Sequence, residues 1–255
     1  MMFLFLLSGC KMKEQNSIYV GQVDILNDLN YDDKTLELDF FSYKPFNEIK
    51  CILEDETIAY TYDVNKNIPI TSSTNKQMFM HELKMQFDDE VKLKEVIMEF
   101  DDELLLFDIG SYQLQKVLSK TKTSLTIDVM YDLTKDTYIK ESTSDLKVTN
   151  LSKIDVTMIG LSNINKEADY QLRVTKINDL CVSANEAKIS EELSYYSDQK
   201  YLCVSTYLSY EYSYMTDVVE KSKVLFKLEY DALKNVKQLK QIDESILSLG
   251  CKLPY

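Results

Sequence analysis

Glycine and proline are scarce in this sequence. Its 255 residues include five glycines and three prolines, whereas loops that hold phosphate groups need several close backbone approaches that only glycine allows. The composition therefore argues against a glycine-rich nucleotide-binding loop.

Histidine and tryptophan are rarer still, because His81 is the single histidine and tryptophan is absent. No two cysteines have the close spacing of a zinc knuckle. The sequence also contains neither a Gly-x-Ser-x-Gly elbow nor a His-Glu-x-x-His pair, which mark serine hydrolases and zinc proteases. We therefore expect no metal, no cofactor and no catalytic residue, and the chain is not expected to be an enzyme.

Positive charge is also in short supply. The 29 basic residues are outnumbered by 42 acidic ones, which gives a formal net charge of −13. Such a chain repels the phosphate backbone of nucleic acids, so we expect no nucleic-acid partner. It also lacks the basic surface that docks on anionic lipid, so membrane association would need a covalent or apolar anchor.

The N-terminus offers such an anchor. The apolar run from Met2 to Leu7 is too short to span a bilayer, which takes about 20 helical residues. It is followed by Ser8, Gly9 and Cys10 and then by a polar stretch. The segment Leu7-Ser8-Gly9-Cys10 resembles the lipobox of bacterial membrane lipoproteins.

This resemblance implies that residues 1–9 are a signal segment and that Cys10 becomes the acylated N-terminus. Residues 10–17 would then be a tether, and the protein would be anchored by lipid to the extracytoplasmic face of the cell membrane. The alternative is that Phe3 to Leu7 form a buried first strand of a cytosolic protein. We favour the lipoprotein because a targeting signal explains the abrupt change to polar residues after Cys10.

If Cys10 carries lipid, four cysteines remain. Cys181 and Cys203 have matching Leu-Cys-Val-Ser contexts, so we consider them a candidate disulfide between neighbouring strands. The alternative is that all four are free thiols that behave as small buried apolar residues.

Apolar and polar residues alternate along most of the chain, as in strands that bury one face. The fold class predicted is mainly β, with two β-sandwich-like antiparallel domains over residues 18–119 and 125–255 and a polar linker between them. Residues 81–107 are predicted to form a three-stranded meander, with a β-bulge near Lys94 or Glu95 where the apolar phase slips.

The spacing changes near the C-terminus and predicts one amphipathic helix that ends at Gly250. Three- and four-residue intervals separate its apolar residues: Leu233, Val236, Leu239, Ile242 and Ile246.

Tyrosines gather between residues 195 and 214. A tyrosine ring with its hydroxyl suits adaptable recognition surfaces, so the cluster is predicted to bind an extracellular carbohydrate or peptide. The alternative is that these residues are strand formers with half-buried rings. The predicted binding residues are Tyr195, Tyr196, Tyr207, Tyr210, Tyr212 and Tyr214.

The sequence thus predicts a non-catalytic, lipid-anchored binding or adhesion module at the cell surface. A transporter-associated solute-binding lipoprotein is the first alternative, although that class usually alternates strands with helices around a cleft. A lipoprotein hydrolase and a structural subunit for envelope assembly are further alternatives.

Overall fold

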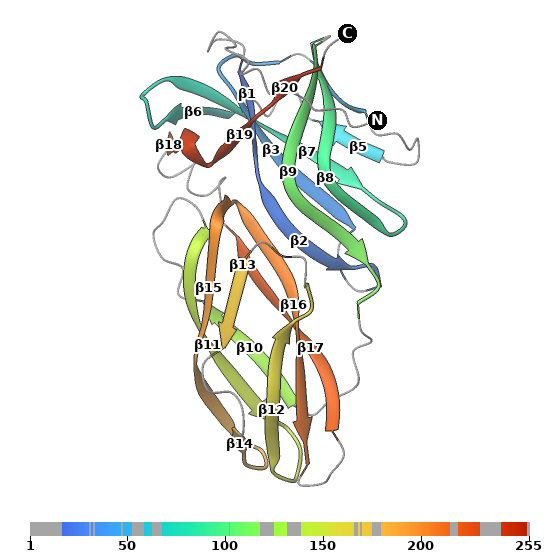
Figure 1. Ribbon diagram of the computed structural model, residues 1–255, viewed down its shortest axis with the longest axis vertical. Helices are drawn as coiled ribbons and strands as arrows, with labels where there is room; N and C mark the ends of the chain where they lie inside the picture. Colours follow the sequence, from blue (N-terminus) through green and yellow to red (C-terminus); the bar gives the residue numbers. More distant parts are fainter. Residues whose placement is uncertain are drawn as a thin grey trace, which may run out of the picture.

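The computed structural model of the chain describes residues 17–30, 32, 34–46, 48–52, 59–62, 68–101, 103–117, 125–131, 139–165, 168, 170–174, 180–214, 219–229 and 241–253. Strands make up most of these residues (Figure 1). The prediction of a mainly β fold is confirmed. The described residues include no helix that is long and apolar enough to cross a membrane.

The first half of the molecule consists of β1 to β9. These strands are β1 (Ile18–Gly21), β2 (Val23–Asp28), β3 (Thr35–Ser42), β4 (Ile49–Ile52), β5 (Ala59–Tyr62), β6 (Ile68–Ser72), β7 (Gln77–Gln86), β8 (Val91–Phe100) and β9 (Glu103–Gln115). Strands β1, β3, β5, β6 and β7 lie in one sheet, and β2, β4, β8 and β9 in another. The apolar faces of the two sheets share one core, in which the ring of Phe40 lies 5.5 Å from that of Phe100 and 5.1 Å from that of Phe107.

The predicted meander is correct for one of its two turns. Strands β8 and β9 form an antiparallel hairpin, and their register shifts between Leu93 and Glu95, which confirms the predicted bulge. Strand β7, however, pairs with β3, β5 and β6 in the other sheet. The chain therefore crosses between sheets after Phe87, because the apolar faces of β7 and β8 meet across the core.

The second half consists of β10 to β17. These strands are β10 (Leu125–Tyr131), β11 (Ile139–Asn150), β12 (Val156–Asn163), β13 (Tyr170–Val174), β14 (Cys181–Val182), β15 (Ala187–Tyr201), β16 (Cys203–Ser213) and β17 (Val219–Glu229). Strands β10, β11, β15 and β13 form one sheet, which shares a core with the sheet of β14, β12, β16 and β17.

Strand β2 joins the two halves. It pairs in parallel with β9 along its whole length, and its first residues, Val23 to Ile25, also pair in parallel with Cys203 to Ser205 of β16. A single sheet therefore runs from the first half into the second. Figure 1 shows the halves end to end, with β2 between them.

The C-terminal segment returns to the first half. It contains β18 (Gln241–Ile242), the 3-10 turn η3 (Glu244–Ile246), β19 (Leu247–Leu249) and β20 (Cys251–Lys252). Strand β18 pairs with β6, β19 with β1 and β20 with β9.

The predicted C-terminal helix is wrong for the residues that the structure describes. Leu233, Val236 and Leu239 lie outside them, but Ile242 is in β18 and Ile246 is in η3. Both isoleucines are buried in the same small core. A strand followed by a capped 3-10 turn thus buries two residues four positions apart in the same core, as a helix would. Spacing alone therefore did not distinguish the helix from the strand and turn.

Candidate functional site

The tyrosine cluster faces inward for the most part. Tyr195, Tyr210 and Tyr212 are at most 2% exposed and belong to the core of the second half. The ring centres of Tyr210 and Tyr212 are 5.8 Å apart, and those of Tyr212 and Tyr214 are 5.5 Å apart. The three rings therefore form the row expected of alternate strand residues. This row lines the core rather than the surface.

The remaining tyrosines of the predicted site lie elsewhere. Tyr196 is 43% exposed and its hydroxyl donates to Asp198 Oδ1 at 2.8 Å. Tyr207 points away from the core of the second half, because it has the opposite strand parity to Tyr210 and Tyr212, yet it is buried by the first half. The six predicted binding tyrosines therefore share no exposed surface.

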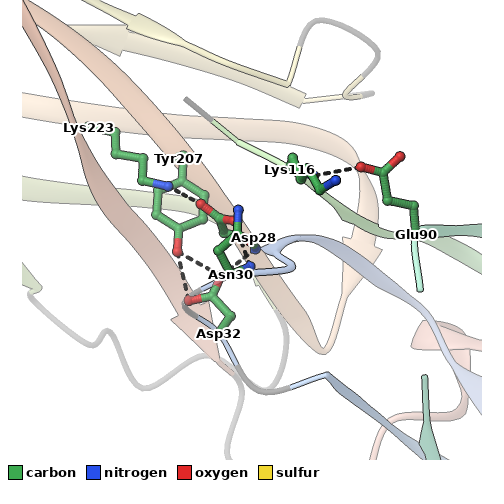
Figure 2. A network of polar contacts seen from close by, with 7 residues as sticks. All are labelled: Asp28, Asn30, Asp32, Glu90, Lys116, Tyr207 and Lys223. Carbon is green, nitrogen blue, oxygen red and sulfur yellow. Dashed lines mark hydrogen bonds and ion pairs between the residues drawn. The ribbon is translucent and has the colours of Figure 1, made fainter. Parts of the chain in front are cut away.

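Tyr207 belongs to a polar network where the two halves meet (Figure 2). Its hydroxyl donates to the carboxylate of Asp32, at 2.7 Å from Oδ1 and 2.6 Å from Oδ2. The backbone N–H of Asp28 also donates to Asp32 Oδ2 at 2.6 Å. Around this network, Leu26 and Val117 of the first half pack with Tyr207.

Lys223 of β17 and Asp28 of β2 form a buried ion pair next to Tyr207. The exposed fractions of the two side chains are 3% and 0%. The Lys223 ammonium also lies 4.5 Å from the centre of the Tyr207 ring, a cation–π arrangement. The second carboxylate oxygen of Asp28 accepts from the backbone N–H of Asn30 at 3.0 Å.

Strand pairing explains how these side chains converge. Ser209 lies opposite Lys223 in the β16–β17 ladder, and Tyr207 is two residues away on the same face of the sheet. The chain turns at the end of β2, where the N–H of Asp32 donates to the carbonyl of Asp28 at 2.9 Å. This turn places both carboxylates over the outer face of the second half.

The network acts as a joint between the halves. Burial, followed by the hydrogen bond to Asp32 and its charge, raises the pKa of Tyr207 above its ordinary value, so the hydroxyl remains a donor. The carboxylates of Asp28 and Asp32 already accept hydrogen bonds within the protein.

Figure 2 also shows Glu90, which accepts from the backbone N–H of Lys116 at 3.2 Å and ties the β7–β8 turn to the residue after β9.

Ser42 and His81 form a second polar pair, in the core of the first half. The serine Oγ lies 2.8 Å from His81 Nε2 and donates to the carbonyl of Lys44 at 2.5 Å, so the imidazole donates to the serine. Both residues are 1% exposed, and the ring of Phe46 lies 5.4 Å from the imidazole. A nucleophile would instead donate its proton to the imidazole, so the pair is arranged as a structural hydrogen bond.

The cysteines of the described residues, Cys51, Cys181, Cys203 and Cys251, are all free thiols. The candidate disulfide is not formed, since Cys181 lies across from the end of β16 near Ser213, ten residues from Cys203. At about 3.3 Å per residue the two cysteines are about 30 Å apart, whereas a disulfide needs Cα atoms within about 7 Å. Cys10 lies outside the described residues.

Within the described part of the chain, no group of three or more His, Cys, Asp or Glu residues is placed to hold a metal ion.

No family model matches this chain, and no curated protein sequence matches it. One similar solved structure is that of the Vibrio cholerae VesB protease, with a TM-score of 0.33 and 9% sequence identity over 85% of this chain and 96% of that one. A likeness of this size carries no argument about function.

The buried ion pair leads to a prediction about stability. Lys223→Met should destabilise the protein by about 3–5 kcal/mol, because it leaves the Asp28 charge buried without its cation. The double variant Lys223→Met/Asp28→Asn should recover much of that loss, since no uncompensated charge remains. Urea unfolding of both variants measures the difference, and equal losses in the two would contradict the account.

His81 leads to a prediction about pH. Burial lowers its pKa from 6.5 to about 4, so the unfolded chain binds a proton below pH 6.5 that the folded chain accepts only near pH 4. The corresponding stability, about 3 kcal/mol, is present above pH 6.5 and is lost as the pH falls towards 4.

In thermal unfolding between pH 7 and 4, His81→Gln should therefore lose less stability than the wild type. The carboxylates titrate equally in both proteins and cancel in the comparison. Parallel pH profiles would show that His81 is not buried in its neutral form.

Proposed function

We propose that this chain is a non-catalytic, lipid-anchored binding or adhesion module on the extracytoplasmic face of a bacterial cell membrane. Its lipid would be carried by Cys10, within the segment Leu7-Ser8-Gly9-Cys10. The two halves, in each of which two sheet faces pack on one core, would be two β-sandwich-like domains. The observation that carries the proposal is a firmly held turn, residues 151–154, that presents apolar side chains at one end of the molecule.

The turn lies far from the end of the molecule that the tether would enter. The described chain begins next to β1 in the first half, whereas the turn joins β11 to β12 at the opposite end (Figure 1). Strand β16 meets the first half at Cys203 to Ser205 and pairs with the start of β12 near Ser213. A lipid at Cys10 would thus leave the turn pointing away from the membrane.

Asn150 holds the turn in place. Its side chain is fully buried, and its amide nitrogen donates to the carbonyls of Ile154, Val182 and Ser183 at 2.8, 2.9 and 3.2 Å. Its amide oxygen accepts from both the N–H and the hydroxyl of Ser152, at 2.9 and 2.6 Å. A turn ordered in this way loses little conformational freedom on binding.

Apolar side chains are exposed on this turn. Leu151 is 61% exposed and Ile154 is 52% exposed, and Ile189 of the neighbouring β15 is 63% exposed. Single exposed apolar residues are ordinary, but here two share one ordered turn. Leucine and isoleucine offer hydrophobic contact and no hydrogen bonds, which favours an apolar peptide segment over a sugar, whose hydroxyls need polar partners.

The solute-binding alternative receives less support. That class alternates strands with helices around a cleft, whereas the described elements are strands apart from a single 3-10 turn. We therefore place the contact surface on the turn rather than in a cleft between domains.

Selection of random peptides displayed on phage against the purified protein tests the turn. The enriched peptides should bind Leu151→Ser/Ile154→Ser at least tenfold more weakly than the wild type. Leu225→Ser, which changes a 41% exposed leucine on β17, serves as the matched control and should bind as the wild type does. Failure to enrich any peptide, or equal binding by all three proteins, would contradict the proposal.

A further inference from the structure

A second polar cluster lies at the top of the second half, where β2 enters it. Its members come from five strands and from one residue that follows β12. They are Asp24 of β2, Asn163 and Asn165 at the end of β12, Tyr170 of β13, Tyr195 of β15 and Thr206 of β16. All but Asn163 are at most 7% exposed.

Some of these groups bond to one another. Asn163 Oδ1 accepts from the hydroxyl of Thr206 and from the backbone N–H of Asn165, both at 3.0 Å. The side-chain amide of Asn165 donates to Asp24 Oδ1 at 3.4 Å. The cluster therefore bridges the two halves through Asp24.

The hydroxyls of Tyr170 and Tyr195 are different. Their rings lie 5.2 Å apart, and the residues are 6% and 2% exposed. Among the described residues, neither hydroxyl has a hydrogen-bond partner. A buried hydroxyl without a partner costs free energy, and most such groups bind an ordered molecule.

Both hydroxyl oxygens are buried from solvent. Burial raises the pKa of Tyr170 most strongly and the charge of Asp24 raises it further, whereas the side chains of Thr206, Asn163 and Asn165 lower it, so these groups lie near its hydroxyl. Burial is also the main cause of the raised pKa of Tyr195; the side chain of Ser197 offsets part of the rise, and Tyr201, Tyr170 and Asp24 add to it. The two donors thus face a shared region next to a buried carboxylate.

We propose that this cluster is an internal binding site for ordered water, whose oxygen accepts hydrogen bonds from the hydroxyls of Tyr170 and Tyr195. Water suits the site because it both accepts and donates, is small enough for a closed interior, and commonly satisfies buried polar groups. It would come either from solvent alone or from the hydration shell of a cation beside Asp24. The proposal does not depend on lipid anchoring or on the turn at residues 151–154.

The two phenylalanine variants test this assignment. If water is bound, Tyr195→Phe and Tyr170→Phe each remove one of its hydrogen bonds, and the equilibrium constant for unfolding should rise about tenfold. Tyr210→Phe is the matched control, because the buried hydroxyl of Tyr210 donates directly to the carbonyl of Leu125 at 3.1 Å. The stability that Tyr210→Phe loses measures how much one satisfied hydrogen bond contributes in this core.

An unchanged or increased stability of both Tyr170→Phe and Tyr195→Phe would overturn the proposal, since removal of a hydroxyl that has no partner relieves a cost. A high-resolution crystal structure without solvent density between the two hydroxyls would overturn it as well.

Calcium chloride and EDTA distinguish the two sources of the water. If the water belongs to a hydrated cation, calcium should raise the Tm of the wild type but not of Asp24→Asn. If it comes from solvent alone, neither protein should respond, while both phenylalanine variants remain destabilised.

Discussion

Strand β2 pairs in parallel with both β9 and β16, and this shared pairing holds the two halves in one arrangement. One strand of six residues belongs to the packing of both halves, so neither half is arranged independently of the other. Leu26 and Val117 make apolar contacts at this joint, but the other side chains there are charged or polar, and each is costly to bury unless its partner is in place. The Asp28–Lys223 pair and the Tyr207–Asp32 hydrogen bonds therefore favour one relative placement of the halves over any other.

This fixed joint matters for the proposed function. A module that is anchored at one end and binds at the other keeps its binding surface at a fixed distance from the anchor only if the two halves do not move relative to each other. The shared sheet extends from the first half towards the turn that carries Leu151 and Ile154. The C-terminal segment adds to this, since β18, β19 and β20 pair with three strands of the first half after the chain has completed the second.

Sequence patterns predicted local structure well and long-range structure poorly. Alternation identified β3, β7 and β8, and a slip in its phase located the bulge beside Leu93, because one-sided burial acts residue by residue. The same alternation placed Tyr210 and Tyr212 on one face but did not say which face was the core. The joint had no local signal, since Asp28 and Lys223 lie 195 positions apart, and an ion pair between distant strands leaves no spacing to find. The spacing of Ile242 and Ile246 was a local signal, but it led to a wrong prediction. A helix and a strand followed by a 3-10 turn both bury residues at a four-residue interval.

The claim that the protein works at the cell surface is tested most directly by intact mass and membrane fractionation of the natively expressed chain and of Cys10→Ala. We expect that the wild type begins at Cys10, carries a diacylglycerol and sediments with membranes, and that the substitution abolishes all three. A soluble protein that retains Met1 would contradict it.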